Sequence, residues 1–176
     1  QTDIEVFEDN TEKIENLILH DQIDVGLVEG EIISSDILNR AFMEDELVLI
    51  CGASHRFAGL TAVEPQELEK EGFIVREKGS GTRKTFENMM TANQLTWKVI
   101  WTCNNSDTIK MAVAQGLGVS VISKRAVENE VTSGSLCQVD VKGIRFNRQF
   151  KIIYHKNKFL TEPMKQLIEL CIAKCG

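Results

Sequence analysis

Short apolar runs alternate with stretches of helical periodicity along the chain, and this alternation constrains the fold more than any other feature. The strand-like runs are residues 4–7, 23–28, 46–50, 73–76, 97–102, 119–122, 136–141 and 150–154. The helical stretches are residues 11–18, 65–69, 82–92, 106–116, 124–131 and from 161 onward. Strands that alternate with helices of about ten residues indicate βαβ units with parallel sheets, so we predict an α/β fold.

Several elements carry signals for their ends and their buried faces. The run at 23–28 is mostly apolar, which is typical of a strand buried on both faces of a parallel sheet. Ser106 is the expected N-cap of the helix at 106–116, and Thr161 is that of the last helix. The buried face of this last helix is expected to comprise Met164, Leu167, Ile168 and Cys171. The pattern leaves the number of lobes open, because a boundary made of crossing strands has no linker signature.

The composition is that of a globular protein with a core of its own. The chain has 176 residues, of which 43% are hydrophobic and 26% charged. A formal net charge of −6 argues against a bare nucleic-acid-binding domain, which normally presents a basic face. No apolar run approaches the roughly 18–20 residues of a membrane helix, and no leader peptide precedes the first strand-like run. We therefore expect a protein without a membrane partner.

The five cysteines do not form the pattern of a disulfide framework, since their number is odd and they are scattered. This favours a reducing compartment, and we expect a cytoplasmic protein. Cys51 and Cys103 adjoin strand-like runs, where free thiols usually act as small buried hydrophobes. Cys171 and Cys175 have a spacing that suits a metal ion, but no third ligand is near them in sequence. We predict no metal site.

The segment from Arg76 to Lys84 combines a strand end, a glycine-rich loop and a helix start. Its two glycines let the backbone turn tightly and approach a ligand. The first-turn N–H groups of the helix, its dipole and the hydroxyls of Ser80 and Thr82 would face one point. Arg83 adds a forked cation that suits a carboxylate or a phosphate. The spacing is not that of a P-loop, and an ordinary helix entry has the same residues, so both interpretations stay open.

A second polar corner, Asn104, Asn105 and Ser106, follows the strand-like run at 97–102 and opens the next helix. Open α/β sheets bind ligands at the carboxyl ends of their strands. A plain N-cap explains this corner equally well when it is taken alone. Two matching corners on neighbouring βα units favour a shared cleft.

Glu29 and Gly30 follow the run at 23–28, again at the carboxyl end of a predicted strand. The Glu29 carboxylate is suited to accept hydrogen bonds from a ligand amine or hydroxyl, or to pair with Arg83. A solvated loop acid is an equally good interpretation of this residue.

Enzymatic chemistry has little support in the sequence. It holds no nucleophile elbow, no HExxH and no paired-carboxylate motif, and no local motif places a base beside Ser80, Cys51 or Cys103. We predict no catalytic residues and no cofactor.

Five segments stand in a fixed order along the chain: IDVGLVEG at 23–30, DELVLI at 45–50, REKGSGTR at 76–83, SDTIKMAV at 106–113 and GLGVSVIS at 116–123. Together they resemble the effector-binding domain of LysR-type transcriptional regulators. Their order and spacing agree across essentially the whole chain. The LVEG and GSGTR segments look closest to the branch that includes CysL-like and CbbR-like regulators.

The resemblance implies a type 2 periplasmic-binding-protein-like fold, with two Rossmann-like lobes joined by crossing strands. One crossing is expected near 46–52 and the return near 119–123. Lobe one would then comprise about 1–48 and 124–176, and lobe two about 49–123. The winged helix-turn-helix and the first strand–loop–helix unit of the family are expected to lie outside this chain, which begins without Met.

The resemblance also implies a function and a set of binding residues. A small effector, guessed to be an organic acid or an anion like sulfate or phosphate, would bind between the lobes. A homodimer or homotetramer would pass the signal to operator DNA through the N-terminal domain. The matching effector-binding residues are Glu29, Gly30, Ser80, Gly81, Thr82, Arg83, Asn104, Asn105 and Ser106.

Two alternatives fit the same fold. One is a solute-binding protein of a transport system. This alternative predicts a leader peptide, and the five unpaired cysteines argue against it. The other is an enzyme on a related scaffold, which predicts a catalytic pair in the cleft.

Overall fold

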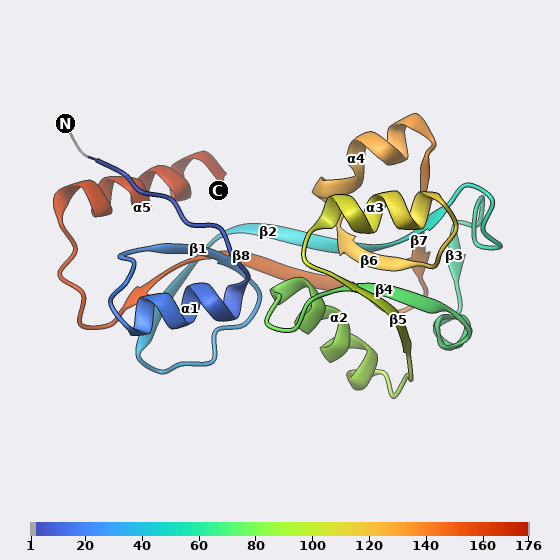
Figure 1. Ribbon diagram of the computed structural model, residues 1–176, viewed down its shortest axis with the longest axis horizontal. Coiled ribbons are helices and arrows are strands. Elements are labelled where there is room, and N and C mark those ends of the chain that lie inside the picture. The colour runs from blue at the N-terminus through green and yellow to red at the C-terminus, as the bar shows by residue number, and fades with distance from the viewer. Residues whose placement is uncertain (1–2, 176) are drawn as a thin grey trace. The chain divides into compact units, whose positions relative to one another are not determined.

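The computed structural model describes residues 3–175, which form two compact units. Unit 1 comprises 3–44, 79–81 and 148–175, and unit 2 comprises 45–78 and 82–147. The chain passes from one unit to the other inside two long strands, β2 (Ile37–Gly52) and β8 (Phe146–His155). Figure 1 shows both strands as long arrows. The fold is the mixed α/β architecture that the alternating pattern predicts.

Unit 1 holds α1 (Thr11–Leu19), β1 (Gly26–Glu29) and α5 (Glu162–Cys175), with the first part of β2 and most of β8. β1 pairs antiparallel with β8, from Gly26 opposite Ile153 to Glu29 opposite Phe150. The i, i+4 pair Ile14 and Ile18 lies on one face of α1, and α1 packs beside β1 (Figure 1). The core of unit 1 consists of Ile14, Ile18, Val28, Ile37 and Ile153.

Unit 2 contains the second part of β2 and most of the remaining elements. β2 pairs antiparallel with β6 (Ser120–Ser123) along one register and with β7 (Leu136–Val141) along another. The short β3 (Ala62–Val63) runs parallel to β7. The 3₁₀ helix η1 (Pro65–Lys70) begins at a proline, whose fixed φ suits a first helical turn. The other elements of this unit are β4 (Gly72–Arg76), α2 (Gly81–Ala92), β5 (Lys98–Cys103), α3 (Ser106–Ala114) and α4 (Lys124–Ser133).

β4 separates two apolar layers of unit 2, because successive residues of a strand point to opposite faces. Phe73 and Val75 belong to the same buried cluster as Phe86 and Met90 of α2. Ile74, between them, belongs to the cluster of Ile109 and Val113 in α3. β5 is the parallel neighbour of β4, and Figure 1 shows α2 and α3 flanking this pair. The βα units predicted at 73–92 and 97–116 are thereby confirmed.

Some predicted elements are wrong. Residues 4–7 form no strand, and Ile4, Val6 and Phe7 are exposed. β1 lies in an antiparallel ladder rather than a parallel sheet, and Leu27 is 53% exposed, so the strand is buried on one face only. In α5, Ile168 is buried but Leu167 is exposed. The N-cap of α3 is Asn105, one residue before Ser106, since the Asn105 side chain accepts from the Thr108 N–H.

The two units differ from the lobe boundaries expected from sequence. Residues 124–147 belong to unit 2, because Val127 of α4 is buried in one cluster with Ile50, Ile122 and Leu136. The chain changes unit at 44–45 and returns at 147–148, rather than near 119–123. Residues 79–81 belong to unit 1 although the chain on both sides of them belongs to unit 2. Within residues 3–175, no helix has both the length and the apolar character that a membrane span requires.

Candidate functional site

The loop Gly79–Gly81 is held in unit 1 by the start of α1 and the end of β1. The Glu12 N–H donates to the Gly79 carbonyl oxygen at 3.1 Å, and Thr11 Oγ1 donates to the Glu29 carbonyl oxygen at 3.0 Å. A Cβ atom at Gly81 would collide with that same Glu29 carbonyl, so only glycine fits there. Gly30 has a φ of +94°, which glycine adopts without strain. Glu29, Gly30, Ser80 and Gly81 are therefore neighbours in one cluster.

Ser80 is the most unusual polar residue of this cluster. It is only 2% exposed, and its Oγ atom makes no hydrogen bond within the described part of the chain. It directly precedes α2, where first-turn N–H groups and the positive end of the helix dipole favour an anion. A buried hydroxyl without a partner costs free energy, about 1–3 kcal/mol. Ser80 thus has a hydrogen-bonding capacity that the fold itself does not use.

Ser120 provides a matched comparison, and it leads to a testable prediction. It is also fully buried, but its Oγ donates to the Ile74 carbonyl oxygen at 2.6 Å. Ser80→Ala is expected to leave the free energy of unfolding unchanged or raise it, because no hydrogen bond is lost. Ser120→Ala is expected to lower it by about 1–2 kcal/mol, because a buried carbonyl loses its donor. Urea unfolding of the two variants measures both values. If Ser80→Ala lowered the free energy of unfolding as much as Ser120→Ala, Ser80 Oγ could not be a hydroxyl without a hydrogen-bond partner.

Glu29 is paired inside unit 1, but with a residue other than Arg83. Arg148 Nη1 lies 3.4 Å from Glu29 Oε1, and the Arg148 side chain is only 5% exposed. The guanidinium also stands 5.4 Å from the centre of the Phe150 ring, within cation–π range. The sequence left open a pairing of Glu29 with Arg83, and the structure assigns Glu29 to Arg148 instead. This pair places a nearly buried cation beside the cluster.

In unit 2, the two predicted corners follow neighbouring parallel strands. Arg76 at the end of β4 is opposite Cys103 at the end of β5. Arg83 lies in the first turn of α2; its Nε donates to Glu87 Oε1 at 2.7 Å and its Nη1 to the Arg76 carbonyl oxygen at 3.2 Å. Thr82, the residue before it, is buried. The guanidinium is thus oriented by the end of β4 and balanced by a carboxylate one turn along the helix.

The corner at residues 104–106 is more exposed than the one at Thr82 and Arg83. Asn105 Oδ1 accepts from the Thr108 N–H at 2.8 Å, and Asn105 Nδ2 donates to Asn104 Oδ1 at 3.1 Å. Both asparagine side chains are exposed, and Ser106 is half-buried. These contacts are those of a helix cap. Both amides remain exposed to solvent beside these contacts.

The predicted residues accordingly belong to two groups. Glu29, Gly30, Ser80 and Gly81 lie together in unit 1, and the remaining five lie in unit 2. Thr11 and Arg148, which also contact this cluster, were not among the residues predicted from sequence. An arginine two residues after Phe146 and two before Phe150 stands at an inward position of an alternating strand, and this was a usable signal. Thr11 had none, because its contact with Glu29 depends on tertiary structure.

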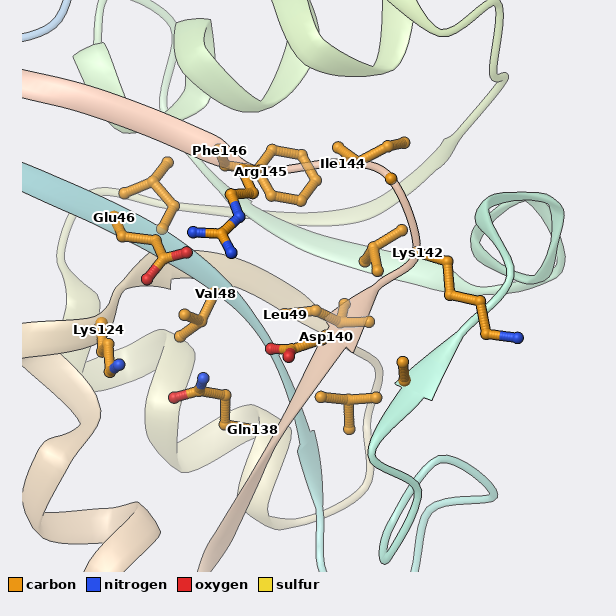
Figure 2. A pocket seen from close by; sticks show the side chains of 15 residues that line it. Glu46, Val48, Leu49, Lys124, Gln138, Asp140, Lys142, Ile144, Arg145 and Phe146 are labelled. Atoms are coloured by element: carbon orange, nitrogen blue, oxygen red, sulfur yellow. The ribbon is translucent and has the colours of Figure 1, made fainter.

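Unit 2 also has a pocket of about 760 Å³ that none of the nine predicted residues lines. Figure 2 shows charged side chains around it, namely the carboxylates of Glu46 and Asp140 and the cations of Lys124, Lys142 and Arg145. They come from β2, α4, β7 and the turn after β7, and they are exposed or half-buried. Charges of both signs line the opening. In the part of the chain described, no three His, Cys, Asp or Glu side chains are grouped as metal ligands.

Comparison with known sequences identifies a matching family and several similar proteins. The family model of the LysR substrate binding domain matches residues 1–176. The chain is 30% identical over 171 residues to the HTH-type transcriptional regulator YeiE of Escherichia coli K12, covering 97% of this chain and 58% of that protein. It is 27% identical over 154 residues to the regulator CysL of Bacillus subtilis, covering 88% of this chain and 52% of CysL. The chain thus spans little more than half the length of these relatives.

A solved structure agrees with these matches. The regulatory domain of CcmR from Synechocystis PCC6803, in complex with 2-PG, has a TM-score of 0.86 and 26% identity to this chain. The match covers 94% of this chain and 80% of the CcmR chain. The type 2 periplasmic-binding-protein-like fold expected from the sequence motifs is confirmed, and CysL and a RuBisCO operon transcriptional regulator of Allochromatium vinosum are among the relatives, as the resemblance implied.

Proposed function

The chain belongs to the LysR substrate-binding domain family, and on this premise we propose that it is the effector-sensing domain of a DNA-binding transcriptional regulator. Its named relatives are transcriptional regulators, of which it matches the part that the family model describes. We propose that the remainder of the protein supplies the DNA-binding domain. The acidic net charge of −6 supports this division, because a domain that binds the DNA backbone needs a basic surface.

The effector is proposed to be a small anion, and the buried Ser80 hydroxyl is the observation that carries this proposal. Ser80 precedes a helix of 12 residues, and its Oγ has no partner within the described residues. A ligand oxygen that accepts from Ser80 would relieve the cost of that unpaired hydroxyl. CcmR, which has the same fold and 26% identity, was solved with the small molecule 2-PG.

The other proposed binding residues contribute according to their chemistry. Gly30 and Gly81 allow the backbone to approach the ligand closely, and Glu29 accepts from a hydroxyl of the effector. Arg83 and Thr82 donate to its anionic group, and the amides of Asn104 and Asn105 with the hydroxyl of Ser106 complete the polar contacts. Arg83 is held by Glu87, so binding an anion requires that Arg83 share or exchange this carboxylate.

The wider role is proposed by analogy with the family. We propose that the protein acts in the cytoplasm as a homodimer or homotetramer and catalyses no reaction of its own. Effector binding regulates the operator only if the effector has different affinities for two arrangements of the protein.

A thermal melting series tests the effector site. Sulfate, phosphate, 2-PG and a panel of small carboxylates are added to the chain at matched ionic strength. A true effector at about a hundred times its Kd adds about 2.7 kcal/mol, which corresponds to a rise in Tm of about 5–10 °C. Ser80→Ala and Arg83→Ala are expected to lose most of this rise, because each removes a donor to the anion.

Lys84→Ala is the matched control for these variants. Lys84 adjoins Arg83 in the first turn of α2 and is exposed, so its removal changes the net charge equally without touching the proposed contacts. A rise in Tm that Lys84→Ala abolishes but Arg83→Ala preserves would reject the site. The absence of a rise with every anion would reject the anionic effector while leaving the family membership intact.

A further inference from the structure

Two of the five cysteines face each other across an antiparallel ladder of unit 2. In the register of β2 and β7, Leu49 is opposite Val139, Ile50 opposite Gln138 and Cys51 opposite Cys137. Directly opposed residues of such a ladder point to the same face, with Cα atoms about 4.5–5.5 Å apart. Disulfides join Cα atoms about 4.4–6.8 Å apart. The backbone geometry of this pair therefore lies within the range of a disulfide.

Both side chains lie on the same face of the ladder, as the backbone register requires, and neither cysteine is in a disulfide. Cys51 is fully buried, and Cys137 is half-buried and packs against the same apolar cluster. We propose that Cys51 and Cys137 are an oxidative modification site, at which a hydroperoxide converts the two thiols into a reversible disulfide.

The chemistry assigns a different role to each cysteine. The thiolate is the reactive form of cysteine, and burial raises the pKa of the Cys51 thiol to about 11. Cys137, which is partly open to solvent, therefore attacks the peroxide oxygen first and becomes a sulfenic acid as the peroxide is reduced to water. The Cys51 sulfur then attacks the Cys137 sulfur, and the hydroxyl leaves with the Cys51 proton as a second water. Two thiols and one hydroperoxide thus give one disulfide and two product molecules, water or alcohol.

The other described cysteines differ from this pair. Cys103 is buried in a separate cluster of unit 2, against Ile109 and Val113, and burial raises the pKa of its thiol as well. Cys171 lies in unit 1, four residues before Cys175 in the sequence. Because they are close in sequence, Cys171 and Cys175 are the pair that competes most directly for oxidation. The experiment therefore has to distinguish the two pairs.

The experiment measures thiols and linkages in the intact chain. The reduced protein is exposed to hydrogen peroxide, and free thiols are counted under denaturing conditions before and after. Two of the five thiols are expected to disappear, with a mass decrease of two hydrogen atoms, and dithiothreitol is expected to restore both. Digestion without reduction should yield one linked peptide pair that contains Cys51 and Cys137. A crosslink that closes so long a loop should also raise Tm by roughly 5 °C or more.

Variants separate this pair from the alternatives. Cys137→Ser and Cys51→Ala are each expected to abolish the linked peptides, whereas Cys103→Ala and the double variant Cys171→Ser with Cys175→Ser should retain them. Because Cys51→Ala removes a core side chain, the peptide map of the wild-type protein is the deciding measurement. A link between Cys171 and Cys175 alone, oxidation of Cys137 to a sulfinic acid, or five unchanged thiols would each overturn the proposal.

Discussion

Gly81→Ala is expected to lower the free energy of unfolding by about 3 kcal/mol, at the upper end of the cost of overpacking. The added Cβ would collide with the Glu29 carbonyl oxygen, which also accepts a hydrogen bond from Thr11. A backbone carbonyl cannot rotate away as a side chain can, so the loop 79–81 has to move from β1. Because Tm changes by about 2–4 °C per kcal/mol in a chain of this size, the expected loss is about 6–12 °C.

Gly134→Ala is the control for this prediction. Gly134 ends α4 with a φ of +78°, and no atom lies within 4 Å of a Cβ placed there. Its replacement therefore adds the backbone cost of a left-handed alanine, about 1–2 kcal/mol, without a collision. Calorimetry of both variants compares a steric cost with a conformational one. If Gly134→Ala lowers Tm more than Gly81→Ala does, the close approach of residues 79–81 to β1 is refuted.

Much of the fold follows from patterns that sequence reasoning can use. The helices α2 and α3 have apolar residues at helical spacing and clear end signals, and both lie within a residue or two of their predicted bounds. β4 was predictable from its short apolar run, and β5 from the alternation of Trp97, Val99 and Trp101. The two corners that follow these strands were expected to be neighbours, and Arg76 opposite Cys103 confirms it.

The elements that were missed depend on partners distant in sequence. The first part of β2 has polar and charged residues between its apolar ones and is largely exposed, so only the apolar end of this strand of 16 residues stood out. Residues 4–7 alternate like a strand, but no ladder in the described part of the chain pairs with them. Propensity marks a segment as able to form a strand, and hydrogen-bonding partners decide whether it does.

The same distinction applies to the candidate site. The residue types of the Gly79–Gly81 loop indicated a close approach, and the position of Glu29 at a strand end was apparent. The identity of the partner of Glu29 was not, because Arg148 lies more than a hundred positions away and reaches Glu29 only through the register of β1 and β8. The opposition of Cys51 and Cys137 is hidden from sequence for the same reason, since a shift of one residue would separate them.

Phe86→Ala is expected to cause the largest single loss of stability in unit 2, about 3–5 kcal/mol. The Phe86 ring lies 4.8 Å from that of Phe73, 5.9 Å from Trp97 and 6.4 Å from Phe146, measured between ring centres. One side chain of α2 thus contacts β4, β8 and the residue that precedes β5. Its removal leaves a cavity among three rings that cannot close without moving strands.

The measurement is chemical unfolding of Phe86→Ala beside Phe159→Ala, which removes the same atoms from a residue that is 83% exposed. The free energy of unfolding of the Phe159 variant is expected to lie within about 0.5 kcal/mol of the wild-type value, because an exposed ring contributes little to stability. Since Phe86 lies one turn after Arg83, the same variant should also weaken any anion-dependent rise in Tm by letting the first turn of α2 shift. Equal stabilities of the two variants would mean that this aromatic cluster does not fix the position of α2. The orientation of Arg83 would then have to come from its hydrogen bonds to Glu87 and to the end of β4.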